Sequence, residues 1–107
     1  MSFSLVRRSL CRALRTGAYG HVPRGEIEAK NWLSTGRVSR QEVVELLLAC
    51  TPANYRLSDH HGIPRIKVHE FTVNATVADH TRWYLKFFFQ PSSPVQGWKV
   101  YSIHPST

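Results

Sequence analysis

The sequence is short of acidic residues and of long apolar runs. Its 107 residues hold 7 Asp and Glu against 14 Lys and Arg, which leaves a net charge of +7. A small domain with this imbalance usually has a polyanionic partner, most often nucleic acid and less often an acidic protein or a membrane surface. No apolar run approaches the roughly 20 residues that a membrane helix needs. We therefore expect nucleic acid or an acidic protein, and no membrane, as the partner.

Cysteine is also scarce. Cys11 and Cys50 are the only two cysteines, and two cysteines without a CxxC pair are not a disulfide framework. Cys50 ends an apolar helical run, which favours a small buried hydrophobic side chain over a nucleophile. We expect a cytoplasmic protein with reduced thiols.

Motifs for metals and for common cofactors are missing. No pair of the six histidines has the HExxH spacing or the spacing of a CxxC…H zinc site. Acids are too few in the second half of the chain for a two-metal nuclease, and a GxSxG elbow, a P-loop and a GxGxxG fingerprint are absent. These absences argue against most cofactor enzymes, and we expect neither a metal nor another cofactor.

The most informative stretch that is present is TRWYLKFFFQ, residues 81–90. Alternation along a strand gives it two faces. One face would bury large apolar side chains, each worth about 1.5–3 kcal/mol: Trp83, Leu85, Phe87 and Phe89. The other face would carry Arg82, Tyr84, Lys86 and Phe88. This second face is either solvated polar surface, as in most half-buried antiparallel strands, or a platform for a phosphate-bearing ligand.

Helices are expected ahead of this strand. Residues 1–20 hold four arginines and no acid, which fits a basic arm or first helix, or alternatively a mitochondrial transit peptide. We favour the arm or helix. A short helix is predicted over residues 26–35, and the capping box Ser39-Arg40-Gln41-Glu42 opens a second helix that runs to Cys50.

Strands are expected after the helices. Residues 54–62 are polar, and Asp59, His60, His61 and Gly62 mark a turn among them. Residues 63–73 predict a strand whose phase changes, which a bulge near His69–Glu70 would explain, and residues 98–104 predict the last strand. The order indicates an α+β fold, with N-terminal helices packed on a small antiparallel sheet. The domain organisation we expect is a basic arm or helix, 1–20, and a single α+β domain, 21–107.

The basic and aromatic residues of the expected strands suit one chemistry. Cleavage of RNA without a metal needs a base for the 2′-hydroxyl, an acid for the leaving 5′-oxygen, cations for the charged phosphorane and a flat group for a nucleobase. Histidine, arginine, lysine and tyrosine supply these functions. Each residue also has an ordinary structural role: a lone strand histidine is usually surface or core, and Arg65 and Lys67 can be edge charges that oppose aggregation.

Four runs of the sequence resemble the MqsR-type toxins, which belong to the RelE-like, barnase-related group of small ribonucleases. The runs are LLLACTPANYRL, IPRIKVHEF, WYLKFFF and WKVYSIHP. Asn54-Tyr55-Arg56 takes the place of an aromatic–Lys pair, and Val68-His69-Glu70-Phe71 takes the place of a Gln-bearing strand end. Tyr84-Leu85-Lys86 matches the family's V-Y-L-K strand, and Tyr101-Ser102-Ile103-His104 matches its terminal strand.

The resemblance implies a RelE/barnase-like fold and a metal-independent endoribonuclease toxin that cleaves RNA (mRNA or tRNA) and is controlled by a cognate antitoxin. The catalytic candidates are Arg56, His69, Tyr84, Lys86 and His104. The RNA-binding candidates are Tyr55, Arg65, Lys67 and Arg82. Two alternatives stay open: a non-enzymatic basic module that binds RNA or an acidic protein, and an organellar protein whose basic arm is cleaved.

The last strand carries a prediction about His104. Regular alternation places His104 with Ser102, Val100 and Trp98, and Ile103 with Tyr101. For His104 to join Lys86 on one face, Ile103 must point into the core.

Overall fold

Nine short elements make up the part of the chain that the computed structural model describes, residues 2–23, 25, 27–91 and 97–106. The helical elements are α1 (Phe3–Thr16), α2 (Ile27–Lys30), α3 (Arg40–Leu48) and the 3-10 turn η1 (Pro52–Asn54). The strands are β1 (Tyr19–His21), β2 (Tyr55–Asp59), β3 (Lys67–Val77), β4 (His80–Gln90) and β5 (Gly97–Pro105). The fold is α+β, as the sequence predicts.

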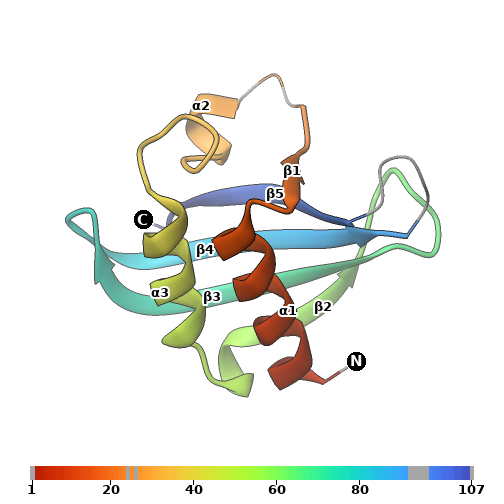
Figure 1. Ribbon diagram of the computed structural model, residues 1–107, viewed down its shortest axis with the longest axis horizontal. Coiled ribbons are helices and arrows are strands. Elements are labelled where there is room, and N and C mark those ends of the chain that lie inside the picture. The colour runs from red at the N-terminus through yellow and green to blue at the C-terminus, as the bar shows by residue number, and fades with distance from the viewer. Residues whose placement is uncertain (1, 24, 26, 92–96, 107) are drawn as a thin grey trace.

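The five strands form one sheet in the order β1-β5-β4-β3-β2, and α1 and α3 lie over the same face of it (Figure 1). The expected meander is present as β3, β4 and β5. The prediction of an antiparallel sheet is wrong at one edge, where β1 pairs with β5 in parallel. The turn predicted at Asp59 to Gly62 is confirmed after β2, but the sequence analysis did not predict β2 itself, which pairs with β3. As an edge strand with no buried residue, β2 has the polar composition of a loop.

Helix α1 is built into the core. Its N-terminus is capped where the Leu5 amide donates to Ser2 Oγ at 3.3 Å, and Gly17, with φ 78°, ends it in the left-handed conformation. The residues that α1 buries are Val6, Leu10, Cys11, Ala13 and Leu14. They belong to the same apolar cluster as the buried residues of α3 and the sheet. The basic stretch 1–20 thus contributes to the packing of the rest of the chain.

Helix α3 begins as predicted. The Glu42 amide donates to Ser39 Oγ at 3.1 Å, and the Ser39 amide donates to Glu42 Oε1 at 2.8 Å, which completes the capping box. The helix predicted over 26–35 is wrong in length. The chain leaves α2 at Asn31, whose side chain accepts from the Ser34 amide, and Trp32 then donates to the Ile103 carbonyl.

The core lies between α1, α3 and one face of the sheet, which we call the covered face. Trp83, Leu85 and Phe87 are fully buried there, which confirms the two-faced prediction for β4. Phe89 is 40% exposed, because it lies near the end of β4, where its ring meets that of Trp98 edge-on. Both cysteines are buried and free. In the described residues, no helix combines the length and apolar character that crossing a membrane requires.

A β-bulge sits in β5, and the register of β3 against β4 also shifts between Asn74 and Val77, away from the predicted place. The pairing of β3 with β4 is continuous from Val68 to Asn74, so the bulge predicted near His69–Glu70 is wrong. The apolar alternation in β3 looks interrupted at Val68 because Val68 is buried on the sheet face opposite the covered face, where it pairs with Phe88. Between β4 and β5 the register shifts after Lys86, and this shift makes Tyr101 the extra residue.

The bulge decides which β5 side chains face the core. Ile103 is fully buried, as the His104 prediction requires, and Trp98 and Val100 are buried with it. The predicted grouping of Trp98 and Val100 with His104 is therefore wrong, since the extra residue resets the alternation at Tyr101.

Candidate active site

The sheet face opposite α1 and α3, here called the open face, carries polar residues of four strands in register. One row across β2, β3, β4 and β5 is Arg56, Glu70, Lys86 and Ser102. The next row across β3, β4 and β5 is Thr72, Tyr84 and His104. Side chains directly opposite each other on antiparallel strands lie about 4.5–5.5 Å apart at Cβ. The register alone therefore gathers two cations, a carboxylate, a phenol and an imidazole.

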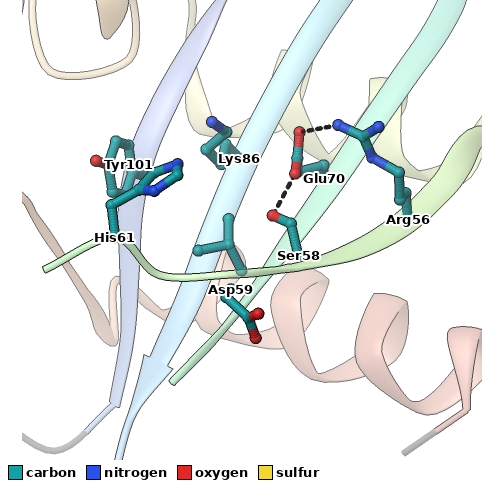
Figure 2. A pocket seen from close by; sticks show the side chains of 8 residues that line it. Arg56, Ser58, Asp59, His61, Glu70, Lys86 and Tyr101 are labelled. Atoms are coloured by element: carbon teal, nitrogen blue, oxygen red, sulfur yellow. Dashed lines mark hydrogen bonds and ion pairs between the residues drawn. The ribbon is translucent and has the colours of Figure 1, made fainter. Parts of the chain in front are cut away.

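Glu70 is the centre of this cluster and is only 6% exposed. Its carboxylate accepts from the hydroxyls of Ser58 and Tyr84, and from Arg56 Nη2 at 3.1 Å. Figure 2 shows Ser58 and Arg56 reaching Glu70 from the neighbouring strand β2. The carboxylate fixes three side chains from two strands in one arrangement.

The hydrogen bonds to Glu70 set two protonation states. Burial acts to raise the pKa of Glu70, but the bonds from Ser58, Tyr84 and Arg56 and the charge of Lys86 hold that pKa at about 2. Burial and the bond to Glu70 raise the pKa of Tyr84 to about 12. At neutral pH Glu70 is an anion and Tyr84 is a phenol. Both therefore shape the site and do not exchange protons there.

Lys86 lies between two aromatic rings on the open face. Its Nζ is 5.4 Å from the centre of the Tyr84 ring and 5.3 Å from that of Tyr101, which is the range of cation–π contact. Together with Arg56 it supplies two positive charges against the one negative charge of Glu70. These three side chains therefore have a net charge of +1, which one further anion, such as a phosphodiester, would neutralise.

His104 is held by its ring and by one nitrogen. The imidazole stacks on Tyr84 with centroids 5.5 Å apart and planes 8° from parallel. Its Nδ1 lies 2.9 Å from the Pro105 carbonyl oxygen. Because a carbonyl oxygen only accepts, Nδ1 carries the proton in this contact, and the neutral ring then has a free lone pair on Nε2. Nε2 is the atom that can take up a proton from a ligand.

A pocket of about 370 Å³ opens beside the row of charges. It is lined by Arg56, Ser58, Asp59, His61, Val68, Glu70, Lys86 and Tyr101 (Figure 2). Its outer wall is the loop after β2, where His60 Nδ1 accepts from the Gly62 and Ile63 amides at 2.9 and 3.0 Å. The His60 ring also meets the edge of Phe88 at 4.8 Å, and Phe88 is buried on this face. The loop turns a flat sheet surface into a hollow.

A second pocket, of about 310 Å³, lies on the other side of the Arg56–Glu70 pair. It is lined by Ala53, Asn54, Tyr55, Arg56, Glu70 and Thr72. Both pockets share Arg56 and Glu70. An extended ligand can thus place one group on each side of this ion pair.

The structure brings together four of the five predicted catalytic residues: Arg56, Tyr84, Lys86 and His104. It does not bring His69 to them. His69 lies on the covered face, where its Nδ1 is 2.6 Å from the Tyr55 hydroxyl and its ring meets Trp98. Burial lowers the pKa of His69 to about 4.

The predicted RNA-binding residues are dispersed. Tyr55 is on the covered face with His69, although it also borders the second pocket. Arg65 is an exposed loop residue with φ 67°, and Lys67 pairs with Asp59 at 2.5 Å beyond the row of charges. Arg82 follows Tyr84 outward along the open face and is exposed.

Several residues of the site have no assigned role in the sequence-based prediction: Ser58, His61, Glu70, Ser102 and Tyr101. Glu70 carried a signal, because an acid inside an apolar strand is rarely buried without partners. Ser58 could not be found because β2 has the composition of a turn, and Tyr101 could not be found because the bulge places it. No group of three or more His, Cys, Asp or Glu side chains that could hold a metal occurs among the residues described.

Three comparisons were made, with protein-family models, with curated proteins and with solved structures, and none found a match to this chain.

Proposed function

We propose that this chain is a metal-independent endoribonuclease of the MqsR-like toxin class, with a RelE/barnase-like fold, that cleaves mRNA or tRNA in the cytoplasm and is controlled by a cognate antitoxin. One observation carries the proposal. Arg56, Lys86 and His104, from three different strands, lie on one open face around the Glu70–Tyr84 hydrogen bond. Cations with an acid–base group beside them are what phosphodiester cleavage requires.

The roles follow from the contacts. The RNA 2′-oxygen attacks phosphorus, a P–O bond to the 2′-oxygen forms, the P–O bond to the 5′-oxygen breaks, and a 2′,3′-cyclic phosphate and a 5′-hydroxyl remain. His104 Nε2 takes the 2′-hydroxyl proton, because Nδ1 is occupied by the Pro105 carbonyl. Solvent water gives a proton to the 5′-oxygen, and the hydroxide that this leaves takes the proton from the His104 imidazolium, which restores the neutral ring. Histidine suits the removal of the 2′-hydroxyl proton because a histidine side chain changes charge near neutral pH.

The remaining residues act on charge and position. Arg56 and Lys86 stabilise the additional negative charge on the phosphorane, and fixed charges of this kind act without reorganising during the reaction. Tyr84 positions both His104, by stacking, and Lys86, by cation–π contact. Glu70 in turn positions Tyr84 and Arg56. His69 has no part in this mechanism.

The proposal is tested with end-labelled RNA in buffer with excess EDTA. The parent protein should cleave and leave 2′,3′-cyclic phosphate and 5′-hydroxyl ends. Lys86→Ala should lower the cleavage rate by about 10²–10³-fold, the usual cost of losing one charge-stabilising group. Lys30→Ala is the control, since Lys30 is a lysine of α2, outside the sheet face that carries Lys86. Cleavage that requires an added divalent metal, or products with 5′-phosphate ends, would contradict the proposal.

A second candidate function, a basic module that binds RNA or an acidic protein without cleaving it, is favoured by the surface of α1. Arg8, Arg12 and Arg15 are exposed and spaced by four and three residues, so they lie along one stripe. Neither of the two ion pairs among the described residues involves α1. The stripe leaves these charges facing solvent, where an acidic antitoxin segment or RNA could meet them.

Point substitutions test this candidate better than removal of residues 1–20, because α1 is part of the core. Arg8→Gln with Arg12→Gln should flatten the log–log salt dependence of single-stranded RNA binding by about 0.7 per arginine, if both contact phosphate. RNA binding without cleavage, together with this change in slope, would favour the module over the enzyme. An unchanged slope would remove α1 as the RNA contact.

A further inference from the structure

The pocket on the open face has a charged end and an aromatic end. Arg56 and Glu70 line the charged end of the pocket. Tyr101 and His61 line the opposite end, away from Arg56 (Figure 2). Tyr101 owes its place to the β-bulge, because it is the residue inserted between the pairs that Ser102 and Val100 make with β4. Bulges often re-aim a side chain beside an active site.

The Tyr101 ring is held firmly. The His60 ring meets it at 5.5 Å and 65°, the Phe88 ring meets it at 6.1 Å and 68°, and Lys86 Nζ lies 5.3 Å from its centre. Phe88 is itself 4% exposed, so the ring rests on a packed base. An aromatic ring fixed in this way loses little entropy when a flat ligand stacks on it.

We propose that Tyr101 and His61 form a nucleobase subsite for the nucleotide adjoining the phosphate that Arg56 and Lys86 bind. The inference rests on the proposed function, which it extends from the phosphate to the base. Single-stranded RNA offers unstacked bases, and proteins bind them on aromatic side chains. The pocket volume of about 370 Å³ falls within the range of small-ligand sites, about 300–1,000 Å³.

The second pocket indicates how a bound RNA strand would run across the sheet. It meets the first pocket at Arg56 and Glu70 and continues past Asn54 and Thr72. A dinucleotide laid across the sheet would hold its central phosphate near Arg56 and Lys86, with one nucleoside toward Thr72 and the other toward Tyr101.

The test measures binding with RNA that cannot be cleaved. The probes are a fluorescein-labelled 2′-O-methyl tetranucleotide and copies of it with a single abasic position, titrated in EDTA and followed by anisotropy. Loss of one base stack should weaken binding of the intact probe to Tyr101→Ala by roughly 5- to 150-fold. Tyr101→Phe, which keeps the ring, should bind like the parent. Phe89→Ala is the control, because Phe89 is an aromatic residue on the other side of β4.

The abasic probes separate base contacts from phosphate contacts. For one abasic position, the parent should bind as weakly as Tyr101→Ala binds the intact probe, and Tyr101→Ala should show no further loss with that probe. Arg56→Ala should weaken binding of the intact and abasic probes by the same factor, because Arg56 lines the end of the pocket away from Tyr101. His61→Ala changes an exposed loop residue outside the apolar core, and it should show a smaller loss of the same selectivity.

Equal binding of the intact probe by the parent, Tyr101→Ala and His61→Ala would overturn the subsite, as would failure of the parent to bind the intact probe. The proposed function is judged separately, from cleavage of the all-ribose tetranucleotide by the parent. Selective binding without cleavage would keep the subsite and reject the ribonuclease. Cleavage without selective binding would keep the ribonuclease and reject the subsite.

Discussion

The two faces of the sheet treat the same side chain in opposite ways, as His69 and His104 show. On the covered face, His69 is packed against Trp98 and bonded to Tyr55, and burial lowers its pKa to about 4. On the open face, His104 stacks on Tyr84 and its Nδ1 is turned to the Pro105 carbonyl, which leaves Nε2 for a ligand.

The difference teaches that two histidines of one sheet meet different surroundings according to the face they occupy, which is why our proposal gives the acid–base role to His104 and not to His69. The covered face supplies apolar neighbours that keep an imidazole neutral. The open face supplies Arg56 and Lys86, whose positive charges are suited to a phosphate, and Glu70 accepts a hydrogen bond from Arg56. Changing one histidine on each face should separate the two faces most clearly, and changes confined to one face should give smaller differences.

The largest difference should appear in the cleavage rate. His104→Ala should lower the single-turnover rate at saturating RNA by about 10²–10⁴-fold, because it removes the proposed acid–base group, while RNA affinity changes little. His69→Ala should leave the turnover of the folded protein close to that of the parent. A parent-like rate for His104→Ala, or a comparable loss for His69→Ala, would break the comparison between the faces.

The next difference concerns stability in mild acid. His69 has a pKa of about 4 in the folded protein against 6.5 ordinarily, so the unfolded chain binds a proton first as the pH falls. Its contribution to stability is therefore present above pH 6.5 and is lost as the pH falls from 6.5 to about 4. Melting temperatures of His69→Phe should fall less steeply than those of the parent across this window. His21 and His60, whose pKa values burial also lowers, keep some slope in both proteins.

The smallest difference is expected for Glu70, in a lower pH window. Its pKa of about 2, against 4.5 ordinarily, means that its ion pair and hydrogen bonds stabilise the protein above pH 4.5 and lose that effect as the pH falls to about 2. Glu70→Gln keeps one acceptor oxygen, so the deficit in melting temperature should be modest at pH 7 and should shrink between pH 4.5 and 2. A deficit that stays constant through this window would show that the Glu70 charge contributes nothing.

Much of the fold could be predicted from the pattern of apolar and polar residues in the sequence. The alternation in residues 81–90 and the capping box at Ser39 both depend on local rules, and both are seen in the structure. Strand β2 did not follow, because a polar edge strand gains its stability from pairing with β3 and shows no apolar period of its own. Strand β1, three residues long, depends in the same way on β5.

The candidate site was predictable only where alternation is unbroken. Tyr84 and Lys86 lie on a regular strand, so their shared face could be read from spacing. Tyr101 could not be placed, because the bulge that turns it toward Lys86 arises from the fit of β5 to β4. The role of Glu70 was hidden for a related reason, since its partners Ser58 and Arg56 come from β2, which the sequence did not predict.

The central claim is that RNA binds on the open face. The most direct measurement is a proton–nitrogen correlation spectrum of the histidine side chains, recorded with and without the 2′-O-methyl tetranucleotide. The imidazole signals of His104 and His61 should shift on binding, whereas that of His69 should stay in place. Binding that leaves His104 and His61 unshifted, or that shifts His69 alone, would contradict the account.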